Sequence, residues 1–431
     1  MKILLTVHDF LPSSRAGTEL YTYYLAQELK RRGFMVELFF VENNQERSVE
    51  HQTYEGLPCT IIRKPLKGFL NLFEEQDALV DRTFLECLER FQPDVVHINH
   101  LLHLSTNIPA IAHQHNVRVV FSLHDHWLKC PRFFLLDLNE HLCEKTTTTK
   151  CIRCCHEFYS QYQLYPPRSG IRGILDRSKS GVKICLSIAV EGYAAYRKMN
   201  RREKIMGSLI KYVDLWIAPS NFLREIMVAW GLPEQKVLFL PHGMPHTLSG
   251  RVRHIRQDEP LRFAYIGTIS RHKGVHVLLE AFRGVDGANL AIYGRRHPDF
   301  YVNFGDVLAQ GNVAIKGIVT DDEKPKVLSE VDALIVPSIW FENAPLVIQE
   351  AFIMGVPVIC SDIGGMKELV RDGQDGLHFR VGSSKDLRRV IEECIKNPFR
   401  LRSLQPVRQN ILTIEDHVSK LIPLYRSLLE S

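Results

Sequence analysis

The sequence lacks any long apolar segment. No uncharged apolar run in its 431 residues approaches the roughly 20 residues that a helix needs to span a bilayer. The apolar start at residues 2–7 is also too short for a signal peptide, and Asp9 follows it without a small-residue cleavage site. We therefore expect a cytoplasmic protein without a membrane-spanning helix.

The chain also lacks a strong excess of charge of either sign. Its formal net charge is +5, from 54 Lys and Arg against 49 Asp and Glu. No binding motif or aromatic stacking pattern accompanies this mild basic balance, so no nucleic-acid partner is expected. Hydrophobic residues make up 45% of the chain and charged residues 24%, which excludes a disordered protein. The length indicates two or three domains.

Short apolar stretches alternate with helical patterns along most of the chain, which is typical of α/β domains with parallel sheets. The first such unit is a strand at 2–7, followed by a helix from Gly17 to about Arg32. A polar, basic segment at 247–259 predicts a linker. The expected division is an N-terminal domain at 1–246, a C-terminal domain at 247–412 and a last helix at 413–431.

The region around Glu342 carries the most specific pattern. Glu342 is expected in a loop just after an apolar strand at 333–337, and Glu350 in the second turn of a helix that opens near Pro345. The free N–H groups at such a helix start bind anions, phosphate most naturally. A glycine-rich turn at 361–365 follows the next strand, expected at 356–360, at the edge where open α/β sheets bind ligands.

A second glycine turn combines backbone freedom with positive charge. Gly267 follows an apolar strand at 261–266, and Arg271 and Lys273 stand just before a predicted helix at 275–282. A glycine turn with an Arg and a Lys at a helix start suits a diphosphate group. The sequence therefore predicts an anion site here as well.

Two positions in the N-terminal half also point to a ligand. Gly17 permits close backbone approach at a helix start, although a plain turn capped by Thr18 is the alternative. His124 follows a strand at 118–123, and the carboxyl end of a central parallel strand is a ligand-binding position. The alternative for His124 is a core histidine bonded to the backbone, and His97 and His100 are as consistent with a structural role as with a functional one.

Five cysteines gather between positions 130 and 155. Cys151 and Cys154 have the spacing of a zinc knuckle, and Cys130 and Cys143 complete a set of four thiolates. Free thiols, another metal and a redox role are the alternatives. Four thiolates leave no open position on a zinc ion, so such a metal would be structural and would hold the insertion at 130–155 together.

A basic stretch at 168–212 is expected to be largely helical. It holds eleven Lys or Arg and three Asp or Glu, mixed with apolar residues. Such a surface suits an anionic membrane or an anionic acceptor such as a lipid-linked diphosphate. A solvated helix face is the alternative.

The C-terminal pattern resembles the donor-binding half of retaining glycosyltransferases of family 4, which have the GT-B fold. The resemblance implies an α/β protein with two doubly wound Rossmann-like domains that face a central cleft, and a last helix that packs back on the first domain. It rests on the following residues: Glu342 and Glu350 with seven residues between them, Gly355-Val356-Pro357-Val358, Gly364-Gly365 with Glu368, Asp372-Gly373, and Gly376-Leu377.

The resemblance implies roles for individual residues. Glu350 would hold the ribose hydroxyls, Glu342 would contact the donor sugar or assist its departure, and His124 would contact the transferred sugar. Lys273, with Arg271, would neutralise the diphosphate, so no metal cofactor is expected for catalysis. The other expected donor contacts are Gly17, Thr18, Gly267, Asn343, Leu346 and Val347.

The predicted activity is that of a retaining hexosyltransferase-type enzyme. It would transfer a sugar from a nucleotide diphosphate donor, with UDP or GDP expected, to a glycan or lipid-linked saccharide in bacterial cell-surface polysaccharide synthesis. The basic stretch at 168–212 would give it a peripheral contact with the inner face of the membrane. A nucleotide-sugar epimerase of the same fold and a non-catalytic glycan-binding scaffold are the alternatives.

Overall fold

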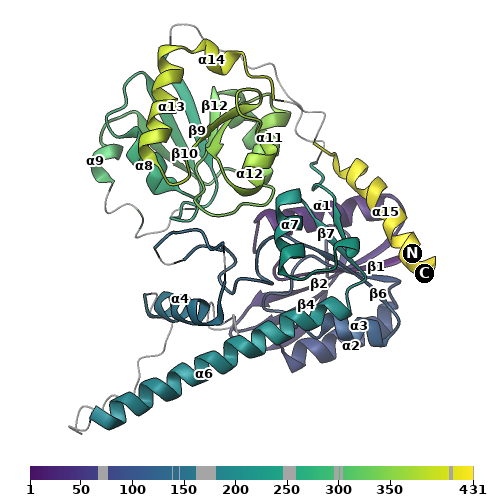
Figure 1. Cartoon of the computed structure of the whole chain (residues 1–431). Coiled ribbons are helices and arrows are strands. Elements are labelled where there is room, and N and C mark those ends of the chain that lie inside the picture. The colour runs from purple at the N-terminus through teal and green to yellow at the C-terminus, as the bar shows by residue number, and fades with distance from the viewer. Residues whose placement is uncertain are drawn as a thin grey trace. The chain divides into compact units, whose positions relative to one another are not determined.

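The chain folds into two α/β units, each built on its own mainly parallel sheet (Figure 1). Unit 1 contains Met1–Ala218, Ile226–Leu238 and Ile422–Ser431, and unit 2 contains Pro219–Glu225 and Phe239–Leu421. Nearly all of the predicted linker at 247–259 lies outside the described residues. The computed structural model describes residues 1–66, 76–137, 139–144, 146–161, 181–245, 259–295, 300, 304–406 and 411–430.

Unit 1 contains an eight-stranded sheet with the strand order β3-β4-β2-β1-β5-β6-β7-β8. Its central strands are mostly apolar and almost entirely buried, as in parallel sheets covered by helices on both sides. The strands are β1 (Lys2–Val7), β2 (Met35–Asn43), β3 (Ser48–Tyr54), β4 (Leu57–Lys64), β5 (Val95–Ile98), β6 (Arg118–Ser122), β7 (Leu215–Ala218) and β8 (Val237–Phe239).

The sequence analysis missed β3, which pairs antiparallel with β4 at the edge of this sheet. Its side chains are mostly polar and exposed, so it carries no apolar signal. The tight connection to β4 runs through Glu55 and Gly56, both with positive φ, which is the backbone of a two-residue hairpin turn.

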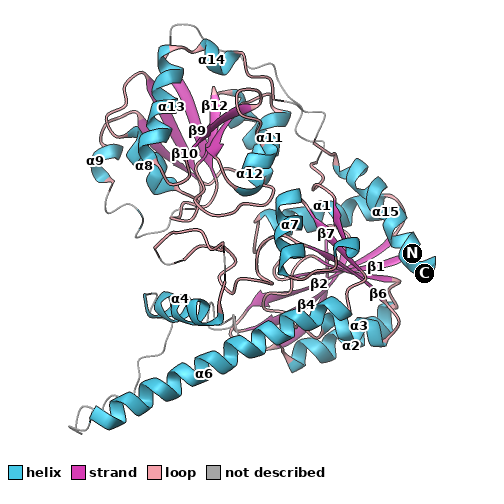
Figure 2. Cartoon of the chain, viewed as in Figure 1, coloured by secondary structure: helices cyan, strands magenta, loops and turns pink. Residues whose placement is uncertain are grey.

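Helices connect the strands of unit 1 (Figure 2). The Asp77 side chain caps α2, because its Oδ1 accepts hydrogen bonds from the N–H groups of Leu79 and Val80. The predicted basic helix is present as α6, and residues 168–180 of that stretch lie outside the described part. The helices are α1 (Gly17–Arg31), α2 (Ala78–Phe91), α3 (Ile108–Gln114), α4 (Thr148–Gln161), α6 (Gly181–Ser208) and α7 (Asn221–Trp230), with short 3₁₀ turns at Leu209–Lys211 and Glu234–Lys236.

Unit 2 contains a six-stranded parallel sheet with the order β11-β10-β9-β12-β13-β14. Helices lie on both sides of it, with α8 and α13 neighbours on one side and α11 and α12 on the other (Figure 1). Its elements are β9 (Leu261–Ile266), α8 (Val275–Phe282), β10 (Ala288–Tyr293), α9 (Gly305–Leu308), β11 (Val313–Gly317), α10 (Lys324–Ser329), β12 (Ala333–Val336), α11 (Leu346–Ile353), β13 (Val358–Ser361), α12 (Gly364–Leu369), β14 (Gly376–Phe379), α13 (Ser384–Lys396) and α14 (Phe399–Arg402).

The last helix, α15 (Ile414–Glu430), ends in unit 1. Its Tyr425 is fully buried, and the hydroxyl is hydrogen-bonded to Nδ1 of His97 on β5. The other ring nitrogen of His97 lies 2.7 Å from the hydroxyl oxygen of Ser122 on β6. His97 is therefore a core histidine with both nitrogens occupied, and the end of α15 packs on the first sheet as expected.

Candidate active site

Glu342 lies in the loop between β12 and α11 and is buried. Its Oε1 atom accepts three hydrogen bonds, from Lys273 Nζ at 2.6 Å, Ser338 Oγ at 2.7 Å and Trp340 Nε1 at 2.8 Å. The Lys273 ammonium also lies 5.0 Å from the centroid of the Trp340 ring. Two residues predicted separately, Glu342 and Lys273, therefore form one ion pair inside unit 2.

The loop from Gly267 to Gly274 carries Lys273 to that position. Gly274 has a φ of +71°, and a Cβ atom there would lie 1.8 Å from the carbonyl oxygen of Pro337. The N–H of Ile339 donates to the carbonyl oxygen of His272 at 3.0 Å. Because the loop packs this closely on the chain that follows β12, only glycine fits at position 274. Arg271 lies in the same loop and is exposed.

Glu350 lies in the second turn of α11, as predicted, and is 6% exposed. Its Oε1 accepts a hydrogen bond from Lys324 Nζ at 2.7 Å, and Lys324 also pairs with Asp321 at 2.9 Å. The second oxygen, Oε2, is buried without a hydrogen-bond partner among the described residues. Burial raises the pKa of Glu350, although Lys324 opposes that shift. The buried Oε2 is thus an acceptor that a ligand hydroxyl can satisfy.

The glycine turn after β13 packs against the backbone beside Glu342. The Gly365 N–H donates to the carbonyl oxygen of Glu342 at 2.7 Å. A Cβ atom on Gly365 would lie 1.5 Å from the carbonyl oxygen of Asn343. The Asn343 residue is buried, as Glu342 is. This contact brings the turn and the start of α11 together, and the first N–H groups of that helix, on Leu346 and Val347, have no intrahelical acceptor.

In unit 1, polar side chains lie after the carboxyl ends of β5 and β6. His100 Nε2 lies 3.2 Å from Asp125 Oδ2, and the N–H of Leu102 donates to His100 Nδ1 at 2.9 Å. The N–H of Trp127 donates to Asp125 Oδ1 at 2.8 Å. Burial raises the pKa of Asp125, but His100, the Trp127 N–H and His126 together outweigh burial, so the pKa of Asp125 is lowered. Because both nitrogens of His100 are engaged, it positions Asp125 rather than offering a free base.

The sequence analysis did not identify the pair formed by His8 and Glu19. His8 follows β1, and its Nε2 lies 3.3 Å from Oε1 of Glu19 in the first turn of α1. Ser14 Oγ donates to the same oxygen at 3.1 Å. Burial raises the pKa of Glu19, and burial with the neighbouring His100 lowers the pKa of His8. The sequence indicates this pair only through position, because His8 follows the end of β1 and Glu19 lies in the first turn of α1.

His124 is half-buried, and its ring lies 5.1 Å from the ring of Tyr21 on α1. The N-cap of α1 is Ala16, which makes no side-chain capping bond, so the alternative that Thr18 caps this helix is wrong. Gly17 is the first residue of the helix and is exposed. His124 belongs to unit 1 and Glu342 to unit 2, and the structure describes each within its own unit.

The four cysteines predicted as a metal site come together in unit 1. Cys130, Cys143, Cys151 and Cys154 line one small cavity, with Cys155 beside them. All five of these cysteines are free thiols. Among the same residues, no three His, Cys, Asp or Glu side chains are arranged so that they could hold a metal ion as they stand.

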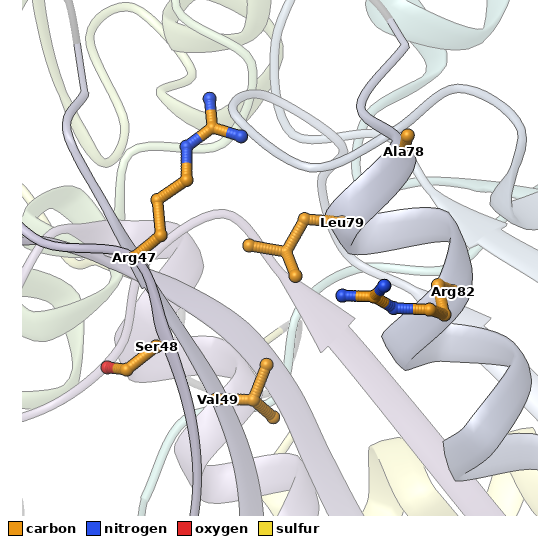
Figure 3. Close-up of a pocket in the computed structure, with 6 residues that line it drawn as sticks. All are labelled: Arg47, Ser48, Val49, Ala78, Leu79 and Arg82. Carbon is orange, nitrogen blue, oxygen red and sulfur yellow. The ribbon is translucent and has the colours of Figure 1, made fainter.

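A larger pocket of about 490 Å³ opens elsewhere in unit 1, between β3 and α2 (Figure 3). Val49 and Leu79 face each other across it, with the guanidinium group of Arg82 next to Leu79. None of the predicted site residues lines this pocket. Its lining residues are Arg47, Ser48, Val49, Ala78, Leu79 and Arg82.

Two α/β units, each built on a mainly parallel sheet, are the architecture of GT-B proteins, and comparison with known proteins agrees. The model of Glycosyltransferase Family 4 matches residues 15–177, and the model of Glycosyl transferases group 1 matches residues 251–410. The chain belongs to the family 4 type of glycosyltransferases.

Several bacterial proteins are similar to this chain in sequence. Two uncharacterized proteins in the cps region of Klebsiella pneumoniae are similar to this chain. The first is 26% identical to it over 43% of this chain and 52% of its own length. The second is 22% identical over 86% of this chain and 88% of its own length. The amylovoran biosynthesis glycosyltransferase AmsK of Erwinia amylovora is 23% identical over 41% of this chain and 46% of its own. The chain thus spans only about half the length of the first and third of these relatives.

Solved structures share the fold over the whole chain. Anabaena Alr3699/HepE in complex with UDP and glucose has a TM-score of 0.67 at 17% identity, covering 99% of this chain and 100% of that one. Sucrose-phosphate synthase from Thermosynechococcus elongatus has a TM-score of 0.69 at 18% identity, covering 100% and 99%. At this identity the similarity establishes the GT-B fold alone. Within the described residues, no helix is both long and apolar enough to span a bilayer.

Proposed function

We propose that this protein is a retaining glycosyltransferase that moves a sugar from a UDP or GDP donor to a glycan or lipid-linked saccharide acceptor. The observation that carries the proposal is the pairing of Glu342 with Lys273 next to the start of α11, with Glu350 one turn further along. Two relatives are described as proteins of a cps region and a third as an amylovoran biosynthesis glycosyltransferase, which supports a role in bacterial surface polysaccharide synthesis.

The donor would occupy the loop edge of unit 2. The buried, unpaired Oε2 of Glu350 would accept a hydrogen bond from a ribose hydroxyl. Lys273 and the first N–H groups of α11 would neutralise the diphosphate, with Arg271 as a second cation. Catalysis would then need no metal ion at the diphosphate. Glu342, fixed by its three donors, would contact the donor sugar.

Retention would follow from displacement on the same face of the sugar. A double displacement needs a carboxylate free to attack the anomeric carbon. Asp125, the carboxylate next to His124, is instead held by His100 and the Trp127 N–H. In the proposed step the acceptor oxygen forms the new bond as the bond to the donor phosphate breaks, and the leaving phosphate takes the hydroxyl proton. His124 would contact the transferred sugar.

The base of the donor can be identified by thermal unfolding of the whole protein with UDP, GDP, ADP or TDP at saturation. A ligand present at 100 times its Kd stabilises a folded protein by about 2.7 kcal/mol, so one nucleotide should raise the midpoint by several degrees. We expect that nucleotide to be UDP or GDP, and we expect the shift to shrink in Glu350→Ala. If no nucleotide raises the midpoint, the scaffold alternative replaces this proposal; sugar interconversion without an acceptor would favour the epimerase.

The acceptor side includes a helix suited to a membrane surface, and we place the protein at the inner face of the cytoplasmic membrane. On α6, Tyr193 is 63% exposed and Tyr196 47% exposed, and the next residues, Arg197 and Lys198, are exposed as well. Met199 and Arg202 are buried, so this part of the helix has one packed face and one free face of aromatic and basic residues. Such a face binds the interface of an anionic membrane.

The double variant Tyr193→Ser, Tyr196→Ser should sediment severalfold less with vesicles that contain anionic lipid, because it loses the apolar part of the contact. Binding of the unaltered protein should weaken as salt is raised. Phe399→Ser removes an exposed aromatic residue of unit 2, 67% exposed, and serves as the matched control. Equal sedimentation of all three proteins would show that α6 does not meet the membrane.

A further inference from the structure

Five thiols surround one small cavity in unit 1. The cavity has a volume of about 20 Å³, which is room for about one water-sized sphere. Cys151 lies close enough to Cys130, Cys143 and Cys154 for the charges of their thiolates to interact. Residues separated by more than twenty positions of chain have therefore been brought to a common point.

The local fold explains how these cysteines meet. An antiparallel bridge between Leu136 and Leu142 folds this segment into a hairpin, and the N–H of Cys143 donates to the carbonyl oxygen of Leu135 at 2.7 Å. The first turns of α4 supply Cys151 and Cys154, which lie on one face of the helix because they are three positions apart. Cys130 before the hairpin, Cys143 at its end and the two cysteines at the start of α4 thus line the same cavity.

Positive charge gathers around the thiols. Arg132 donates to Cys154 Sγ at 3.0 Å and to the carbonyl oxygen of Leu136 at 3.1 Å. Lys150 is hydrogen-bonded to Cys143, and Arg132 and Arg202 act electrostatically on Cys130. A zinc ion with four thiolates has a net charge of −2, and buried charge needs opposite charge nearby. Arg132, Lys150 and Arg202 would offset part of that charge.

We propose that Cys130, Cys143, Cys151 and Cys154 bind one structural zinc ion. Cys155 is the fifth thiol at the cavity, but it is 4% exposed and forms an apolar cluster with Met199, so it is left as a core residue. Because no three ligands are already arranged to hold a metal, the thiols must close on the ion as it binds. Zinc suits this set, since thiolates select it and it takes four ligands in a tetrahedron.

The metal would stabilise the segment that follows His124. Arg202 of α6 donates to the carbonyl oxygens of Trp127 and Leu128 and lies 5.6 Å from the Trp127 ring. Thr148, at the start of α4, donates to Glu203 on α6 at 3.2 Å. The cysteine segment, α6 and the loop after β6 are thereby connected through direct contacts. The zinc site goes beyond the proposed transfer reaction, and its test does not depend on activity.

The test is the metal content of the purified, full-length protein by inductively coupled plasma mass spectrometry. We expect about one zinc per chain that survives dialysis against EDTA and is released when thiols are blocked with a mercurial. Cobalt exchanged into the site should show the charge-transfer and red d–d bands of a tetrahedral thiolate site. Cys154→Ser should lose most of the zinc and lower the unfolding midpoint by several degrees.

Cys155→Ala is the matched control, because this residue is next to Cys154 on the same helix and lines the same cavity. It should keep its zinc and its cobalt spectrum. Absence of zinc from the unaltered protein, an iron signal, or a disulfide among these cysteines in mass spectra would overturn the proposal. If Cys154→Ser does not fold, the metal content and cobalt spectrum of the unaltered protein decide alone. Loss of zinc in Cys155→Ala would overturn the assigned ligand set.

Discussion

Glu350→Ala should raise the KM for the nucleotide sugar by roughly 10- to 100-fold and lower kcat much less. A hydrogen bond to a charged group contributes about 1.5–3 kcal/mol, which corresponds to that range. Because the ribose hydroxyls do not react, their contact is equally strong before and during the reaction, so its loss appears in KM. Lys324 keeps Asp321 as a partner at 2.9 Å, so the variant leaves no isolated buried cation. Steady-state kinetics with the identified donor measures both constants.

Two further variants separate a ribose contact from a structural role. Glu330→Ala removes an exposed glutamate at the end of α10 and should leave donor binding unchanged. Glu350→Gln keeps an acceptor oxygen and should lie between the wild type and Glu350→Ala. Because burial raises the pKa of Glu350, wild-type donor affinity should fall as pH is lowered through that pKa, whereas the Gln variant should not show this loss. An unchanged donor KM in Glu350→Ala would contradict the assignment.

Part of this site could be read from the sequence because its signals are local. Gly274 and Pro345 mark helix starts by their backbone preferences, and α8 spans Val275–Phe282 and α11 begins at Leu346 as predicted. The predicted strand from Val356 begins only at Val358, since the N–H of Val356 closes α11 by donating to Ala351 at 2.8 Å. Because its N–H is used in this way, Val356 belongs to the turn after α11 and does not pair as the first residue of β13.

The partners of the predicted residues could not be read in this way. Lys324 pairs with Glu350 across 26 positions of chain, and Lys273 pairs with Glu342 across 69. Such pairs depend on how the loops at one edge of the sheet pack against each other. The spacing of apolar residues along the sequence carries no information on that packing. Likewise, the sequence left His97 as consistent with a functional role as with a structural one, and only the contact with Tyr425, 328 positions away, shows that it belongs to the core.

Lys273→Met should lower kcat by about 10²- to 10³-fold with a smaller change in the donor KM. Negative charge builds up on the leaving diphosphate as the bond to the sugar breaks, and a cation fixed beside it stabilises that state more than the bound substrate. Removing one such donor from an active site typically costs about 3–4 kcal/mol of transition-state stabilisation. Glu342 retains its bonds from Ser338 and Trp340, so its carboxylate stays in place without Lys273.

The pair of Lys273 with Glu342 makes the interpretation testable from both sides. Lys273→Arg keeps the charge and should restore part of kcat, whereas Arg271→Met removes an exposed cation of the same loop and should have a much smaller effect. If Lys273→Met instead raised the KM and left kcat intact, Lys273 would bind donor and transition state equally. The additional stabilisation of the leaving diphosphate in the transition state would then come chiefly from the N–H groups at the start of α11.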